Sequence, residues 1–265
     1  NSSANSVVIT VGGTGDAAIR DIRSNTTSGI VTITVAGGNI SDNLAGEGAN
    51  VTAAGLALTS STGIGTSGTG NINTAVSKLE GTTSTGGIFV SNTGSLTVGG
   101  VNGLLNGLSV TGASGQIELI SDNTITVNEG ISAPNDITLV GGAQIQLNAA
   151  VSTADAVRIS TSGGVSQTAS GTVTANEFGV RNSGTGNIVL NQGNLVTTFA
   201  ASNSANGGTI QFKNTNSLTV GSISSHGSLF ASTNGITTNI GNVTIISSGA
   251  MTIGTGAGQS ISAAG

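Results

Sequence analysis

The sequence predicts an all-β protein, a right-handed parallel β-helix (β-solenoid) with three short strands in each coil of about 20–25 residues. Small residues dominate the chain, with 44 Gly among 265 residues, and charged residues make up only 6%. Apolar and polar residues alternate in short runs, and these runs recur at a nearly constant spacing. We therefore expect the whole chain, residues 1–265, to form a single elongated β-solenoid domain.

Composition argues against several other classes of protein. Gly, Ser, Thr, Asn and Val are poor helix formers, and Leu, Glu and Lys are scarce, so helical bundles are disfavoured. A hydrophobic fraction of 36% argues against disorder, and no apolar run is long enough to predict a membrane span. The net charge of −5 and the absence of Trp and Tyr disfavour nucleic acid as a partner.

The first 50 residues match the pattern of the rest of the chain less well. Residues 30–35, IVTITV, and Ile40 nevertheless have strand character. The stretches 12–29, 41–50 and 100–116 are irregular and are the candidates for inserted side loops.

The middle of the chain predicts three columns of core residues. The first column is Ile117, Ile137, Val157 and Phe178, the second is Ile125, Ile145, Val165 and Ile188, and the third is Ile131, Val151, Val173 and Leu195. Strands this short are not stable alone, so each is expected to pair in parallel with its equivalent one coil later, about 4.8 Å along the axis. Inside the core, Phe178 and Phe199 are expected to stack.

A longer duplication lies over the short repeat. VTAAGLAL at 51–58 recurs as VTANEFGV at 173–180, and FVSNTGSLTVG at 89–99 recurs as QFKNTNSLTVG at 211–221, both displaced by 122 residues. SGTGNI at 67–72 recurs at 183–188, displaced by 116 residues, as a change in loop length would produce. The domain is thus expected to contain two diverged blocks of several coils.

The sequence predicts no catalytic, cofactor-binding or metal-ligating residues and no cofactor. Residues 63–68 fit GxGxxG, but no helix is expected to follow, so a turn of the solenoid is favoured over a dinucleotide site. His226, the single histidine, is interpreted as an exposed loop residue. Asp136 and Asp155 fall near equivalent corners, where capping of backbone N–H groups is favoured over a shared cation.

From about residue 50 onward the chain resembles the β-strand-repeat regions of large bacterial surface exoproteins, the filamentous-haemagglutinin-like and autotransporter-like adhesins. The phrases that carry this resemblance are TGIGTSGTGNINTAVSKL at 62–79, GGIFVSNTGSLTVGGVNG at 86–103, NDITLVGGAQIQLNAAVS at 135–152 and GVSQTASGTVTA at 164–175. The resemblance implies secretion, display at the cell surface, and service as a stalk, adhesive fibre or matrix component. It implies no catalytic residues.

The expected function is therefore structural, as part of a secreted extracellular fibre or cell-surface stalk. No cap is evident at either end, so the coils are expected to continue, through a longer chain or through end-to-end self-association. The alternative is an adhesin that binds a cell-surface glycan or protein through side loops. A polysaccharide-active β-helix enzyme is disfavoured, because the 11 acidic residues are spread thinly and no Trp or Tyr can stack on sugars.

Overall fold

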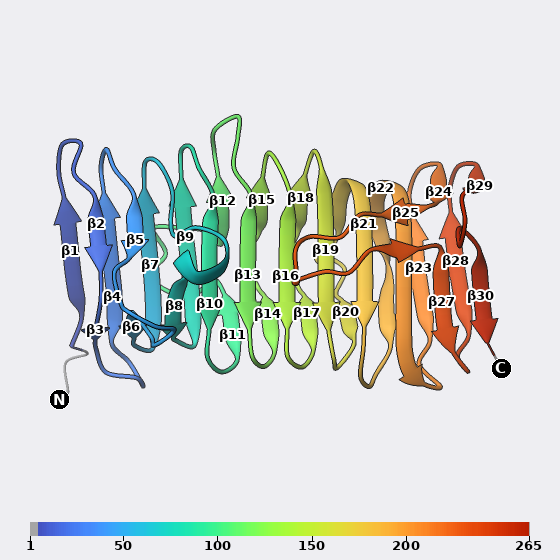
Figure 1. Cartoon of the computed structure of the whole chain (residues 1–265), viewed down its shortest axis with the longest axis horizontal. Coiled ribbons are helices and arrows are strands. Elements are labelled where there is room, and N and C mark those ends of the chain that lie inside the picture. Colours follow the sequence, from blue (N-terminus) through green and yellow to red (C-terminus); the bar gives the residue numbers. More distant parts are fainter. Residues whose placement is uncertain (1–4, 265) are drawn as a thin grey trace. The chain divides into compact units, whose positions relative to one another are not determined.

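The computed structural model describes residues 5–264, and the chain divides into two compact units, Asn1–Asn135 (unit 1) and Asp136–Gly265 (unit 2). Each unit is a β-solenoid of parallel strands, and the two units hold about 11 turns between them (Figure 1). The one helix among the described residues is η1 (Gly68–Gly70), a single 3₁₀ turn, and the predicted all-β fold class is confirmed. No helix within residues 5–264 is long and apolar enough to cross a membrane.

The longest stack of strands in unit 1 takes one strand from each successive coil. Neighbouring strands within this stack pair in parallel and in register. Val7 of the first strand is opposite Val31, and at the other end of the stack Leu108 is opposite Ile131. The stack consists of β1 (Val7–Val11), β4 (Ile30–Val35), β7 (Gly55–Ser60), β9 (Lys78–Thr83), β12 (Leu108–Val110) and β15 (Ile131–Ala133). The other strands of the unit are β2 (Ala17–Ile19), β3 (Ile22–Arg23), β5 (Ile40–Asp42), β6 (Val51–Thr52), β8 (Ile72–Ala75), β10 (Ile88–Asn92), β11 (Leu96–Val98), β13 (Ile117–Ser121) and β14 (Ile125–Val127).

Unit 2 contains a stack that is built in the same way. It consists of β16 (Ile137–Gly141), β19 (Ala156–Thr161), β21 (Val173–Asn182), β22 (Ile188–Asn206), β27 (Ile236–Asn239) and β30 (Ile261–Ala264). The other parallel strands are β17 (Ile145–Leu147), β18 (Val151–Thr153), β20 (Val165–Gln167), β23 (Ile210–Asn214), β24 (Leu218–Val220), β28 (Val243–Ser247) and β29 (Met251–Ile253). Because β21 and β22 continue through corners of the coil, each pairs with strands on more than one face.

Each unit carries an insertion at the same level of its stack. In unit 1, β9 pairs first with β11 and then with β12, and residues 99–107 between these two strands form a loop. In unit 2, β22 pairs first with β24 and then with β27, and residues 221–235 leave the coil between them. This longer insertion holds the antiparallel pair β25 (Ser222–Ile223) and β26 (Thr233–Asn234). These coils exceed the predicted length, since the register partners Ile210 and Val243 lie 33 residues apart.

The two copies of SGTGNI do not occupy equivalent places. Residues 183–188 form the corner between β21 and β22 and the first residue of β22. Residues 67–72 instead follow Ile64, which, like Ile72, bridges to the strand β10. Residues 65–71, including η1, are therefore an insertion within one face of a coil.

Two of the predicted core columns are confirmed in unit 2. Ile137, Val157 and Phe178 are successive register partners, and so are Ile145, Val165 and Ile188. All six side chains are at most 1% exposed. In unit 1, Ile117 and Ile125 have Ile88 and Leu96 as their partners. Burial of these aliphatic columns between coils is the main source of stability in such a fold.

The phenylalanines of unit 2 pack differently from the prediction. Phe178 and Phe199 are register partners, but their rings tilt by 54°, with centroids 5.6 Å apart. The stacked pair is Phe199 and Phe212, with centroids 3.8 Å apart and an interplanar angle of 6°. Phe212 belongs to β23 on another face of the coil and reaches Phe199 inside the core, which a linear repeat does not reveal.

The third predicted column is wrong at Leu195. Val151 and Val173 are partners, but Leu195 is opposite Thr174 and is 40% exposed, whereas Val196 is 3% exposed. The cause is Asn194, which turns its amide into the corner and accepts the N–H of Val173 at 2.9 Å. Because alternate residues of a strand face opposite sides, this inward Asn194 places Leu195 outside.

Buried asparagines close corners in both units. Oδ1 of Asn92 accepts the N–H of Val76 at 3.0 Å in unit 1, and Oδ1 of Asn214 accepts the N–H of Val196 at 2.9 Å in unit 2. The Nδ2 groups of both asparagines donate to carbonyl groups of the turn that follows. A side-chain amide can donate and accept at once, so each asparagine substitutes for a strand partner where the chain turns.

Candidate functional site

The GxGxxG match, residues 63–68, lies in and beside the inserted loop 65–71. Because η1 has only three residues, it offers no helix N-terminus of the kind that binds a pyrophosphate. Ser67 of this loop donates to Oε2 of Glu118 at 2.8 Å, and Gln116 donates to Oε1 of Glu118 at 2.9 Å. The glycine motif is therefore a surface loop anchored on a buried carboxylate.

Asp136 takes part in an ion pair that the sequence did not predict. Its Oδ2 lies 2.6 Å from Nη1 of Arg158, and its Oδ1 accepts the N–H of Ala156 at 3.3 Å. Asp136 thus caps a corner N–H group, as expected. Within residues 5–264, no three His, Cys, Asp or Glu side chains come together as a metal site would require.

Carboxylates also anchor the inserted loop 99–107 of unit 1. Glu80 is fully buried, and its Oε1 accepts the N–H of Val101 at 2.7 Å. Glu129 accepts the N–H groups of Gly100 and Gly107 at 3.0 and 2.8 Å. Both carboxyl groups accept hydrogen bonds from the backbone of the loop, so these two side chains hold the loop against the coil.

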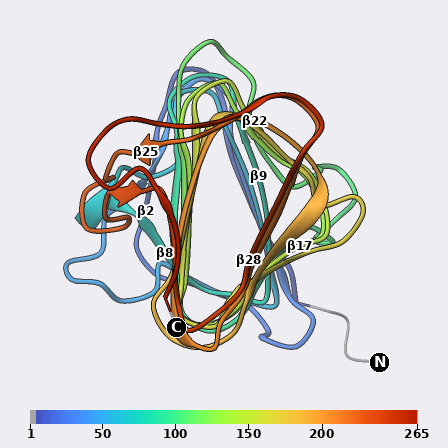
Figure 2. The same cartoon turned by 90° about the vertical axis from the view of Figure 1, so that its right-hand side faces the viewer.

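Arginines anchor the longer insertion of unit 2, residues 221–235, which we call the strap. The strap lies outside the coils and runs over the outer face of β19 and β21 (Figures 1 and 2). Nε of Arg158 donates to the carbonyl of Ser224 at 3.0 Å, and Nη1 of Arg181 donates to the carbonyl of Ser232 at 3.4 Å. His226 is half-buried in the strap rather than exposed, and its backbone N–H donates to the carbonyl of Phe230 at 2.8 Å.

Apolar contacts complete the attachment of the strap. Ile223 and Phe230 are at most 1% exposed and pack with Ala200 of β22. A Cβ at Gly179 of β21 would lie 2.6 Å from Cζ of Phe230, so only glycine fits under this ring. The strap therefore forms a small second core on the outside of the coil.

Replacing Phe230 with alanine should loosen the strap without unfolding the coils. Loss of a buried phenylalanine lowers the free energy that keeps the strap closed by about 3 kcal/mol or more. This corresponds to roughly a hundredfold more frequent opening of the segment. Amide hydrogen exchange of residues 222–234 should rise accordingly, while exchange in β19 and β21 stays slow. Leu229→Ala, at a half-buried position of the same loop, is the matched control. Equal protection of the strap in both variants would contradict the attachment described here.

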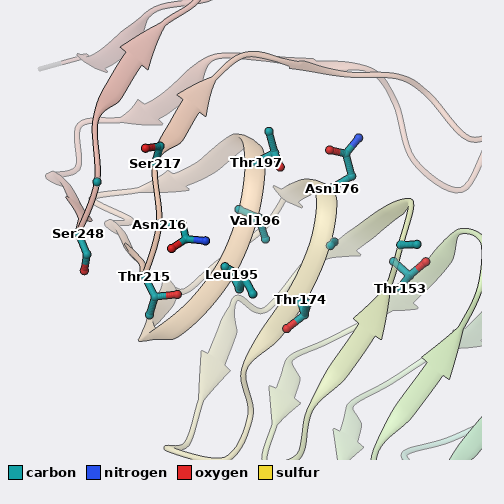
Figure 3. Close-up of a pocket in the computed structure, with 13 residues that line it drawn as sticks. Thr153, Thr174, Asn176, Leu195, Val196, Thr197, Thr215, Asn216, Ser217 and Ser248 are labelled. Atoms are coloured by element: carbon teal, nitrogen blue, oxygen red, sulfur yellow. The ribbon is translucent and has the colours of Figure 1, made fainter.

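An open groove of about 710 Å³, the corner groove, lies along one corner of unit 2 (Figure 3). Its lining residues belong to β18, β21 and β22 and to the turns that follow β18, β23 and β28. Its hydroxyl groups belong to Thr153, Thr174, Thr197, Thr215, Ser217 and Ser248. Its amides belong to Asn176 and Asn216, and the rest of its lining is Ala154, Ala175, Leu195, Val196 and Gly249. None of these residues is charged.

The corner groove exists because two coils separate at this corner. Asn194 pairs with Asn214 and Thr198 pairs with Thr219, but the residues between them are not partners. The amide of Asn214 fills the gap in the backbone pairing, accepting from the N–H of Val196 and donating to its carbonyl, both at 2.9 Å. The backbone N–H and C=O groups of Val196 therefore both have hydrogen-bond partners, and the side chain of Leu195 stays exposed above them.

Sequence reasoning missed the corner groove and the strap. A signal for the groove exists in hindsight, because Asn194 stands in the third core column where an aliphatic residue was expected. The strap, GSISSHGSLFASTNG, has much the same small polar composition as ordinary turns, from which its apolar residues Ile223, Leu229 and Phe230 distinguish it. The stretch 12–29, predicted as a loop, instead contains β2 and β3. The stretch 41–50 is irregular after β5 ends at Asp42, as predicted, and 100–116 includes most of the inserted loop 99–107 together with β12.

No model of a known protein family, no curated protein and no solved structure matches this chain.

Proposed function

We propose that the protein is a structural segment of an extracellular fibre or cell-surface stalk whose coils continue by end-to-end association. Secretion and display at the surface belong to this proposal through the resemblance of the sequence. The observation that carries the proposal is the state of the last coil of unit 2, where core columns are left partly uncovered.

The last coil exposes residues that belong to the core columns. Met251 and Ile253 are the register partners of Leu218 and Val220, and Ile261 is the partner of Ile236. The three partners are at most 2% exposed, whereas Met251, Ile253 and Ile261 are 49%, 40% and 38% exposed. Another coil laid over this face would bury them, and each aliphatic side chain so covered contributes about 1.5–3 kcal/mol.

The proposal assigns to this face a further coil, supplied by a second copy of the chain or by continuation of the same chain. The first strand of unit 1, β1, pairs with β4 on one side only among the described residues, and its Val7, Ile9 and Val11 continue the core columns of Val31, Ile33 and Val35. A head-to-tail contact joins two different faces, so it can repeat without closing and build a filament. Pairing of the two open strand edges would also satisfy backbone groups that are otherwise left to water.

Ile253→Asp should weaken end-to-end association at least tenfold, because a carboxylate would be buried at the junction without a partner. Sedimentation velocity over a range of concentrations measures this effect, and electron micrographs report thread length. Ile246→Asp is the matched control, because Ile246 lies on the same coil and is 51% exposed but is opposite the outward-facing Lys213. A wild-type chain that sediments as a monomer at every concentration would contradict the proposal, as would equal effects of the two variants.

The side loops support the structural role over the adhesin alternative. The strap and the loop 99–107 are both held down on their coils by buried charged side chains, so neither is free to adapt to a partner. The buried carboxylates of Glu80 and Glu118 accept hydrogen bonds from loop groups and serve as anchors. These contacts also weigh against the polysaccharide-active enzyme, which needs carboxylates that reach a substrate.

A further inference from the structure

We propose that the corner groove of unit 2 binds a neutral glycan chain that lies across successive coils. This inference goes beyond the structural role and does not depend on end-to-end association. It rests on the chemistry of the lining, on the state of the backbone in the floor of the groove, and on the spacing of its side chains.

The lining offers what an uncharged polyol requires. Hydroxyl and amide side chains, such as those of Thr197 and Asn216, can both donate to and accept from sugar hydroxyl groups. Leu195 is an exposed aliphatic side chain among these polar groups and can cover the apolar C–H face of a sugar ring. The volume of about 710 Å³ lies within the usual range of ligand-binding sites.

Two other classes of occupant fit the groove less well. An extended peptide would bind by adding a strand to an open backbone edge, but the N–H and C=O groups of Val196 are already bound by Asn214. An anionic polymer would need basic groups, and the lining has none. A neutral glycan is recognised through side chains and needs neither feature.

The side chains also repeat in the direction that a chain ligand would follow. Thr174 and Leu195 are register partners on successive coils, and Thr215 and Ser248 follow the paired strand ends Asn214 and Ser247 on the next two coils. Where their strands pair, as at Thr174 and Leu195, neighbouring coils are separated by about 4.8 Å, which is close to the length of one pyranose unit in an extended chain. A row of similar contacts is therefore presented at intervals that suit a glycan laid along the stack (Figure 3).

Isothermal titration of the full chain with neutral hexasaccharides of glucose, of mannose and of N-acetylglucosamine tests this inference, with hexagalacturonate as the anionic counterpart. We expect saturable binding of at least one neutral oligosaccharide. The double variant Leu195→Ala with Asn216→Ala should weaken that binding at least tenfold, and both positions are exposed, so the fold should be kept. Ile246→Ala, at an exposed isoleucine outside the groove, should leave binding unchanged.

Three results would overturn the inference. They are the absence of saturable binding by any neutral hexasaccharide, binding of hexagalacturonate alone, and equal affinity in the wild type and the double variant. Sedimentation of the same samples reports end-to-end association separately, so a failure of glycan binding is distinguishable from a failure of the structural proposal.

Discussion

Replacing Phe199 with alanine is expected to lower the free energy of unfolding by roughly 3–5 kcal/mol, the largest effect of any single substitution considered. Phe199 is fully buried, stacks on Phe212 at 3.8 Å and touches Phe178 through a tilted contact. Alanine would leave a cavity that rigid neighbouring coils cannot close. Calorimetry or circular dichroism during urea unfolding measures the change.

Phe199→Leu should be much milder, costing less than about 1.5 kcal/mol, because leucine is accommodated at the equivalent level of unit 1. There Leu79 lies between Leu56 and Val98, as Phe199 lies between Phe178 and Val220. Phe89→Ala is a further control, because Phe89 faces outward from β10 and is only half-buried. A Phe199→Ala variant as stable as Phe89→Ala would show that the aromatic cluster contributes little.

Asn214→Ala is expected to cost roughly 3 kcal/mol or more, because it leaves several buried backbone groups without partners at once. The side chain donates to the carbonyl groups of Val196, Asn216 and Ser217 and accepts from the N–H of Val196. An unfolding experiment measures this loss. The substitution should also disturb the corner groove, because Asn214 fills the gap in pairing beneath it.

The neighbouring Asn216→Ala provides the matched control for this prediction. Asn216 is exposed and lies only two residues away in the same turn. Its loss should change the free energy of unfolding by no more than about 0.5 kcal/mol, as is usual for surface positions. Comparable losses in both variants would mean that the turn as a whole, rather than the buried amide, sets the stability of this corner.

The sparse charges of this chain have a common structural use that composition alone does not disclose. Glu80 and Glu129 hold the loop 99–107, Glu118 holds the loop 65–71, and Arg158 with Arg181 holds the strap. In a fold made of neutral small residues, a charged side chain gives the strongest hydrogen bond available for fixing a loop to the outer face of a coil.

The sequence by itself determined the fold class, the period and most of the core. Apolar residues about 20 apart were correctly placed as partners, as in Ile137 with Val157 and Ile145 with Val165. This success has a simple cause, since one coil repeats the environment of the last and the same residue type then recurs at the same height.

Only the tertiary structure decided where this repetition is broken. Asn194 takes a core position and turns Leu195 outward, and Phe212 reaches Phe199 from another face of the coil. The strap folds onto Gly179 and Ala200 through Ile223 and Phe230, which lie far from them in sequence. A periodic pattern records which residues share a column, whereas contacts between columns and between a loop and the outer face depend on how the coil closes in space.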